Sequence, residues 1–316
     1  MYTNGLIAVR EKYLLNDKIL KLCDTTAEEA FRTLSENGFG KSAEVTSVYN
    51  YEKLVAADEE DIDKFIREYA PTRAEAVYLL SSRDFHNAKA AVKARFLKSE
   101  LDGMLAPEGL IPVQTILKCV EGGDFQPLGK ELGGAVEEAF KLFEEDRASG
   151  AEIGIIFEKA LYVYLNANCS KNGVLKKLLS VKADMTNILT AMRSAEEENA
   201  RKCYLTGGKL SEKLLGNLFS DDKERAEAFK GTPYYDFVKK CISDRERNLP
   251  LTSAEKICDS FEAEFFTSKK YELVKTQPFL YYVFRRRVEN ANARILIACL
   301  LAGMGEIEIK NRMRTF

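Results

Sequence analysis

A carboxylate, an imidazole and an amide lie within four residues of this chain, in the stretch Asp84-Phe85-His86-Asn87. An acid beside a histidine is a combination that general acid–base catalysis uses, so this stretch is a candidate for chemistry. Its acid-x-x-Asn spacing returns at Asp184 and Asn187, and again at Glu289 and Asn292, with the acids 100 and 105 residues apart. The histidine does not return. The pattern that persists is therefore an acid and an amide, used three times.

Two interpretations of this motif follow from its placement on a helix. At about 100° per residue, Asp84 and Asn87 fall on the same arc as Ala88 and Val92, which is an apolar face. A carboxylate and an amide on such a face must be hydrogen-bonded there. We expect Asp84 and Asp184 to be N-caps of helices that begin at the motif, with the asparagines supporting the cap.

The third copy fits this scheme less well, because Glu289 follows a run that is already helical, so we expect Asn292 to bond across helices. The alternative interpretation is a single central site, which would require Asp84, Asp184 and Glu289 to converge within about 10 Å. His86 alone is expected to be exposed or a satisfied packing residue. No catalytic, cofactor-binding or metal-binding residue is predicted.

The elements that would position these residues are helices. Residues 52–69 form a strongly acidic amphipathic pattern, and Thr25, Thr72 and Thr252 each precede a glutamate by three residues, which is the capping-box signature. Helices are also expected over residues 72–80, 88–97, 153–165 and 174–179, and from residue 277 onward. Strand patterns are almost absent. The sequence predicts an all-α fold.

The long, nearly constant spacing of the motif indicates one helical unit used three times. The first residues of the chain look like the missing second half of the third unit, so the repeat is circularly offset. We expect unit one at residues 41–149, unit two at 150–247, and unit three at 248–316 together with 1–40. These three similar helical subdomains would close into a pseudo-threefold funnel.

Composition excludes several function classes. The chain has 316 residues and a formal net charge of −2, so it lacks the basic footprint that nucleic-acid binding needs. Its seven cysteines are scattered and it holds one histidine, which argues against a metal site and for a reducing cytoplasm. No apolar run approaches the roughly 18 residues of a membrane span. Contact with a membrane is therefore expected only through a partner.

Two further motifs are a glycine-containing stretch and a cluster of arginines. Residues 206–209 (Thr-Gly-Gly-Lys) look like half of a phosphate-binding loop, but they follow a helix and lack the preceding strand, so a turn is expected and no nucleotide site. The densest basic cluster is Arg285-Arg286-Arg287 with Arg294. Arg287 and Arg294 are seven residues apart and share a helix face. They form either a solvated face or a contact surface for an acidic partner.

Taken in order, the short motifs resemble those of the C subunit of the bacterial and archaeal V/A-type ATPases, whose eukaryotic counterpart is the d subunit of the vacuolar ATPase. The residues that carry the resemblance are Asp84 to Asn87 with Ala94-Arg95, Asp184 and Asn187 with Leu205 to Gly208, Gly231-Thr232-Pro233, and Pro278-Phe279-Leu280 through Glu289 and Asn292. They cover nearly the whole chain. Each motif is short, and only the ordered set is specific.

The resemblance implies a funnel of three helical domains that acts as a non-catalytic rotor part of the central stalk. It implies two partners: the central shaft, made of the D and F subunits, and the membrane ring of proteolipid subunits. It also implies a cytoplasmic protein held at the membrane by its complex, with proton or sodium transport driven by torque. The alternative is a free-standing helical scaffold or adaptor that binds a partner helix in its cavity.

Overall fold

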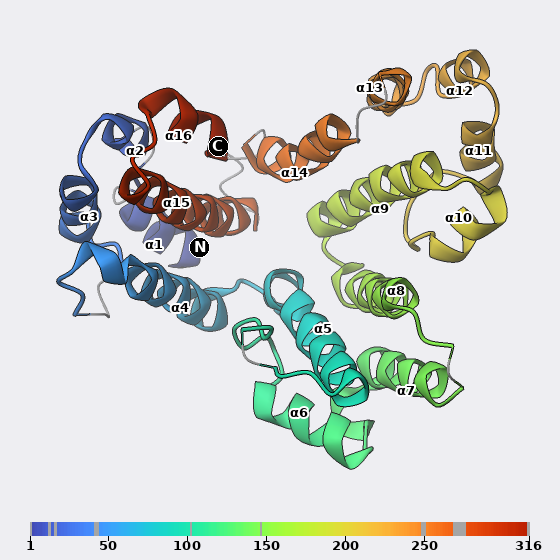
Figure 1. Ribbon diagram of the computed structural model, residues 1–316, viewed down its shortest axis with the longest axis horizontal. Coiled ribbons are helices and arrows are strands. Elements are labelled where there is room, and N and C mark those ends of the chain that lie inside the picture. The colour runs from blue at the N-terminus through green and yellow to red at the C-terminus, as the bar shows by residue number, and fades with distance from the viewer. Residues whose placement is uncertain are drawn as a thin grey trace. The chain divides into compact units, whose positions relative to one another are not determined.

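The computed structural model describes residues 2–11, 14–15, 18–40, 44–101, 103–145, 147–247, 251–267 and 276–314. These residues form sixteen α-helices joined by loops and short 3-10 turns, with no strand among them, which confirms the predicted all-α fold (Figure 1). The helices are α1 (Tyr2–Arg10), α2 (Lys18–Lys21), α3 (Ala27–Glu36), α4 (Tyr51–Tyr69), α5 (Arg73–Leu97), α6 (Val113–Gly122), α7 (Lys130–Glu144), α8 (Gly150–Cys169), α9 (Gly173–Arg193), α10 (Glu197–Cys203), α11 (Glu212–Gly216), α12 (Asp222–Ala228), α13 (Tyr235–Glu246), α14 (Thr252–Thr267), α15 (Gln277–Leu301) and α16 (Glu306–Arg312).

The chain forms two compact units. One, which we call the terminal unit, consists of Met1–Thr72 and Ser260–Phe316, and the other, the central unit, consists of Arg73–Asp259. Helix α4 belongs to the terminal unit, whereas the sequence placed it with the first repeat. The division into three repeats stays a prediction.

In the terminal unit, the long helix α15 packs against α1, α3, α4 and α16. Its core joins residues from both ends of the chain, including Leu34 and Leu54 from the first part and Ala293, Leu296 and Ile309 from the last. All five are 3% exposed or less. The two ends of the sequence therefore contribute to one hydrophobic core.

In the central unit, α5 lies among α6, α7 and α8 (Figure 1). Buried residues occur on several sides of α5, as expected for a helix covered by neighbours all round. The rings of Phe96 and Phe140 meet edge to face with centroids 4.9 Å apart, and Phe96 stacks on Phe143 at 4.3 Å. Aromatic pairs of this kind add to the burial energy and hold α5 against α7.

The three motif copies lie inside long continuous helices, so the expectation that helices begin at the first two copies was wrong, whereas the third copy lies within a helix as expected. Helix α5 runs unbroken through Asp84, and α9 runs unbroken through Asp184. The reason is that tertiary hydrogen bonds satisfy these polar side chains, which removes their competition with the helix backbone.

One predicted cap was misplaced by a single residue. The N-cap of α3 is Thr26, whose side chain accepts a hydrogen bond from the Glu29 N–H at 3.2 Å. Thr25 instead donates its hydroxyl to the Leu22 carbonyl at 2.8 Å. The side chain of Thr252 lies outside the described residues, so the third capping box cannot be compared.

Candidate functional site

The first copy of the motif holds the loop between α5 and α6. Asp84 is 2% exposed, and its two carboxylate oxygens accept hydrogen bonds from the backbone N–H groups of Leu110 at 2.9 Å and Ile111 at 3.1 Å. A Cβ atom added to Gly109 would collide with the same carboxylate. Asp84 is therefore a clamp on a loop, and its role as an N-cap is excluded.

Asn87, one turn further along α5, fastens the same loop. Its side-chain N–H donates to the Ala106 carbonyl at 3.2 Å, and its side-chain oxygen accepts from the Ala106 N–H at 2.8 Å. Asn87 is fully buried. The acid and the amide thus bind two backbone segments of one loop from one helix face.

The second copy repeats this arrangement on α9. Asp184 accepts hydrogen bonds from the N–H groups of Lys209 at 2.8 Å and Leu210 at 3.0 Å, and a Cβ atom at Gly208 would collide with it. The hydroxyl of Tyr234 donates to Asp184 at 2.7 Å. Burial, followed by this carboxylate, raises the pKa of Tyr234 well above its usual range, so the hydroxyl stays a donor.

The amide of the second copy makes the same paired contact. Asn187 donates to the Leu205 carbonyl at 3.0 Å and accepts from the Leu205 N–H at 2.7 Å. Gly109 and Gly208 each follow the residue bound by asparagine by three positions, so the two loops match residue for residue. The motif therefore specifies a helix-to-loop clamp.

The third copy keeps the amide contact. Asn292 is fully buried on α15, donates to the Arg314 carbonyl at 3.0 Å and accepts from its N–H at 2.8 Å. Glu289, also fully buried, lies 3.8 Å from a guanidinium nitrogen of Arg286. Asn292 therefore bonds outside its own helix, but its partner is the non-helical backbone of Arg314 after α16 and not another helix, as had been expected.

His86 is exposed, and its Nε2 lies 2.9 Å from the Met104 carbonyl oxygen, as expected for a satisfied surface histidine. Asp84 and Asp184 are each occupied by their own loop, while Glu289 belongs to the terminal unit. These contacts give no support to a single central site.

The two arginines expected at a partner surface are engaged within the terminal unit. A guanidinium nitrogen of Arg287 lies 3.8 Å from an oxygen of Asp63, and Arg294 lies 3.0 Å from Glu52. Both acids come from α4, so these ion pairs connect α15 to α4. The Arg294 pair is about half exposed on both sides, so its effect on stability is small and its charge stays accessible to a partner.

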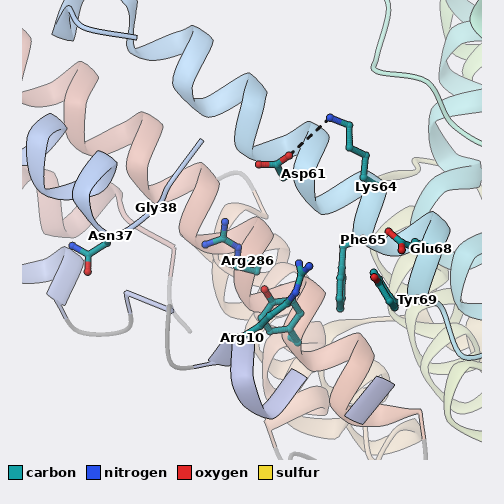
Figure 2. A pocket seen from close by; sticks show the side chains of 10 residues that line it. Arg10, Asn37, Gly38, Asp61, Lys64, Phe65, Glu68, Tyr69 and Arg286 are labelled. Carbon is teal, nitrogen blue, oxygen red and sulfur yellow. Dashed lines mark ion pairs between the residues drawn. The ribbon is translucent and has the colours of Figure 1, made fainter. Parts of the chain in front are cut away.

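The terminal unit has a cavity of about 440 Å³ lined by α1, α4, α15 and the residues Asn37 and Gly38 after α3, which we call the α1–α4–α15 pocket. Figure 2 shows Phe65 and Tyr69 of its aromatic wall next to charged side chains, and Tyr282 also lines the pocket. The Arg10 guanidinium lies 4.5 Å from the centre of the Phe65 ring and 5.9 Å from that of Tyr69. This cation–π stack holds a positive charge in the lining of the pocket.

The remaining charges of the pocket are mixed. Arg286 and Lys64 are its other cations, Asp61 and Glu68 its acids, and Lys64 lies 3.9 Å from Asp61 (Figure 2). A wall that combines aromatic rings with both signs of charge suits a protein segment that carries both apolar and charged side chains. Nothing in this arrangement resembles a nucleophile with a base.

A buried ion pair lies beneath this pocket. The Arg286 guanidinium pairs with Asp58, which is 1% exposed and also accepts from the Asn290 amide at 3.3 Å. Burial raises the pKa of the Asp58 carboxyl above its ordinary value, while Arg286, Asn290 and the Gly40 N–H act in the opposite direction. The pair thus fixes α15 on α4 at a substantial desolvation penalty.

Sequence reasoning missed the pocket because its residues come from four separate segments of the chain. Arg286 was visible only as part of a basic run, and Arg10 had no neighbouring signal. Two regular features could have suggested the clamps: glycines at matching positions after two of the acids, and a polar pair inside an apolar helix face.

Among the described residues, no helix combines the length and the apolar character that crossing a membrane requires. Within the same residues, no group of three histidine, cysteine, aspartate or glutamate side chains is placed to hold a metal ion.

Comparison with known proteins gives the family. A family model described as ATP synthase (C/AC39) subunit matches residues 3–312. The chain is also 21% identical over 312 residues to the C subunit of the V-type sodium ATPase of Enterococcus hirae, an alignment that covers 96% of this chain and 92% of that relative. The family model spans all three copies of the motif, and the resemblance to the C subunit of V/A-type ATPases is confirmed. The chain belongs to the ATP synthase (C/AC39) subunit family.

Proposed function

We propose that this chain is a non-catalytic part of the central stalk that couples the shaft of the D and F subunits to the membrane proteolipid ring. In this role it transmits torque, so that ATP hydrolysis or synthesis on other subunits is linked to ion transport. The observation that carries the proposal is the family match over residues 3–312. The chain would then lie in the cytoplasm and meet the membrane only through the ring.

A part that transmits torque must resist deformation, and the clamps suit this need. In all three motif helices an asparagine holds the backbone of a distant segment by two hydrogen bonds. These hydrogen bonds, buried for Asn187 and partly buried for Asn87 and Asn292, are costly to break, because each separation leaves backbone groups without partners. The loops are therefore held to the helices at fixed points.

The α1–α4–α15 pocket is the surface in the terminal unit that we assign to a partner. Its fixed cation Arg10, its aromatic wall and its mixed charges fit a helical or C-terminal segment of the shaft better than a small substrate. The ion carried is selected by the ring, so the sodium named for the relative does not define this chain's own chemistry.

The test is direct binding of the full-length chain. Purified chain is mixed with purified D–F complex and, separately, with detergent-solubilised proteolipid ring, and co-elution is followed by size-exclusion chromatography. We expect stable complexes with both, and no ATP turnover by the chain alone. Folded chain that binds neither would overturn the proposal. Binding of unrelated amphipathic helical peptides without binding of the shaft would favour the adaptor alternative.

A matched pair of variants separates partner contact from internal packing. If Arg294 contacts the shaft or the ring, Arg294→Gln weakens that complex, whereas Glu52→Gln breaks the same ion pair but leaves the cation in place. Equal binding by wild type and both variants would remove Arg294 from the contact surface. Thermal unfolding of both variants is the control for folding, and the changes should be small because the pair is exposed.

A further inference from the structure

A second cavity lies in the central unit, between α8, α9 and the loop that follows α10. Its volume is about 610 Å³, within the range of small-molecule sites. We call it the α8–α9 pocket. Its apolar wall includes Val163 and Leu179, and the fully buried Cys169 also lines it. The second clamp holds the loop on one side of this space, and none of the ion pairs described above lies in it.

The charge around the pocket has one sign. Lys176, Lys177 and Lys209 line it, and among the described residues that line it there is no carboxylate. In the part of the chain that the structure describes, none of these three lysines has an ion-pair partner. Asp184, one turn beyond Ser180 on α9, is already engaged by two backbone N–H groups and the Tyr234 hydroxyl. The pocket therefore attracts anions.

A buried hydroxyl also lines the pocket. Ser180 is 7% exposed, and its Oγ has no hydrogen-bond partner among the described residues. A buried hydroxyl in this state is unfavourable unless something in the pocket pairs with it. Ser180 and Lys176 are four residues apart on α9, so they lie on one face of the helix. The Oγ is enclosed by protein, so an acceptor in the pocket pairs with it only when the Ser180 side chain rotates toward the cavity, next to the Lys176 cation.

The loop that completes the pocket is held in place from two sides. Residues 206–209, which the sequence predicts to be a turn, form one. The Asn166 amide donates to the Thr206 carbonyl at 3.0 Å, and Asp184 accepts from the Lys209 N–H at 2.8 Å. Gly207 approaches Asn166 so closely that a Cβ atom there would collide with its amide. The site is therefore preformed, which lowers the entropy that a ligand must offset.

We propose that the α8–α9 pocket binds a small organic anion, a phosphate or carboxylate joined to an apolar group. The lysines and Ser180 take the acidic group, and Val163 and Leu179 contact the apolar group. The apolar wall distinguishes this site from one for a bare inorganic ion. The inference does not depend on the stalk function, since it concerns the isolated chain.

The first test uses phenyl phosphate as the probe and the full-length chain, with binding measured by isothermal titration calorimetry. We expect a single site, with inorganic phosphate and benzyl alcohol each at least about tenfold weaker, because each lacks one half of the recognition. Absence of phenyl phosphate binding, or equal binding of all three compounds, would overturn the proposal.

Variants test where the probe binds. Lys176→Gln, Lys177→Gln and Lys209→Gln combined should weaken binding at least about tenfold, since each charged hydrogen bond contributes substantially. The matched control combines Lys118→Gln, Lys130→Gln and Lys223→Gln, three exposed lysines outside the pocket. It removes the same total charge and should leave binding unchanged. Equal loss in both triple variants would mean general electrostatic attraction, which contradicts a site.

Single substitutions at two positions sharpen the assignment. Ser180→Ala should weaken phenyl phosphate binding by about threefold to tenfold without lowering the thermal midpoint, because no protein partner loses a hydrogen bond. Val163 is 43% exposed, so Val163→Asp and Val163→Lys should both fold. Aspartate there should weaken binding and lysine should preserve or strengthen it. If Val163→Asp and Val163→Lys weaken phenyl phosphate binding equally, the pocket is not an anion site.

The anion could come from a soluble compound or from a lipid headgroup, and sedimentation with vesicles distinguishes the two sources. Phosphatidylglycerol vesicles are compared with phosphatidylcholine vesicles. Phenyl phosphate binding without sedimentation supports a soluble ligand. Sedimentation with phosphatidylglycerol that the lysine variants abolish supports the same site with a lipid as its source. Sedimentation that the lysine variants do not change, together with no phenyl phosphate binding, would overturn the inference.

Discussion

Asn187 and the backbone of Leu205 are joined by two hydrogen bonds, one in each direction, across 18 residues of sequence. The side chain thereby pairs with a peptide group as a neighbouring strand would, although no strand is present among the described residues. Asn87 makes the same pair with Ala106, and Asn292 makes it with Arg314. The same pair of hydrogen bonds, between an asparagine side chain and one peptide unit, thus recurs in all three copies of the motif.

Replacing Asn187 by leucine should destabilise the chain by about 2–4 kcal/mol, because the N–H and C=O of Leu205 would both lose their partner in a buried place. Aspartate keeps the acceptor and loses the donor, so Asn187→Asp should also destabilise. Urea unfolding monitored by circular dichroism measures both variants.

Asn168 offers a control of the same residue type. Its amide donates only to the Tyr164 carbonyl of its own helix, at 2.9 Å, and the residue is partly exposed. Asn168→Ala should therefore change the free energy of unfolding by less than about 1 kcal/mol. If Asn168→Ala lowers the free energy of unfolding as much as Asn187→Leu does, the paired hydrogen bonds of Asn187 stabilise the fold no more than an ordinary side-chain hydrogen bond.

Alanine should destabilise the fold at Gly109 and Gly208 but stabilise it at Gly154. At Gly109 and Gly208 a Cβ atom would collide with the clamping carboxylates of Asp84 and Asp184, so alanine should destabilise by about 1–3 kcal/mol. Gly154, inside α8, has nothing within 4 Å of its added Cβ atom. Gly154→Ala should stabilise by about 0.5–1 kcal/mol, because alanine favours the helix. Stabilisation by alanine at Gly208 would contradict the close approach.

The fold class and most long helices could be predicted from the sequence because their signals are local. Helix α4 begins and ends within a residue of the predicted 52–69 pattern. The polar motif residues misled the boundary predictions, since Asp84 and Asp184 look like caps when only their neighbours are considered. Their partners are backbone N–H groups 25 to 27 residues away, and backbone groups have no sequence signature.

The pockets were beyond sequence reasoning for a related reason. The α1–α4–α15 pocket unites Arg10, Phe65 and Tyr282, which are far apart in the chain. The α8–α9 pocket depends on Ser180 lacking a partner, a property of packing that no residue pattern reveals. The tripled arginine run did draw attention to α15, but only the structure shows that Arg286 points to Asp58 and Arg287 to Asp63.

The buried pair of Asp58 and Arg286 should respond asymmetrically to mutation. Arg286→Gln leaves a buried carboxylate without its cation and should destabilise the fold by about 3–5 kcal/mol. Asp58→Asn should change stability by less than about 1 kcal/mol, because Arg286 still has Glu289 at 3.8 Å and the ring of Phe39 at 5.5 Å. The double variant should be more stable than Arg286→Gln alone, and unfolding in urea completes the double-mutant cycle.

The same pair predicts a pH dependence. The folded-state pKa of Asp58 is raised above its ordinary value, so the folded chain binds this proton more tightly than the unfolded chain does. The contribution of Asp58 to stability therefore falls as pH rises from the ordinary carboxyl range through the raised pKa. Asp58→Asn should remove this component. If the free energy of unfolding of wild type instead rises with pH relative to that of Asp58→Asn, the pKa of Asp58 is lowered in the folded chain. Attraction by Arg286 would then outweigh burial.

Alkylation of the cysteines should follow burial and thiol acidity. Burial raises the pKa of Cys169 and Cys241 to about 12 from an ordinary 9.0, which lowers their thiolate fraction at pH 8 by about a thousandfold. Cys203 is partly exposed. Iodoacetamide at pH 8 should therefore modify Cys203 in the native protein, and Cys169 and Cys241 only in urea, as peptide mass spectrometry can follow. Native alkylation of Cys169 at the rate of Cys203 would contradict the packing of α8 on its neighbours.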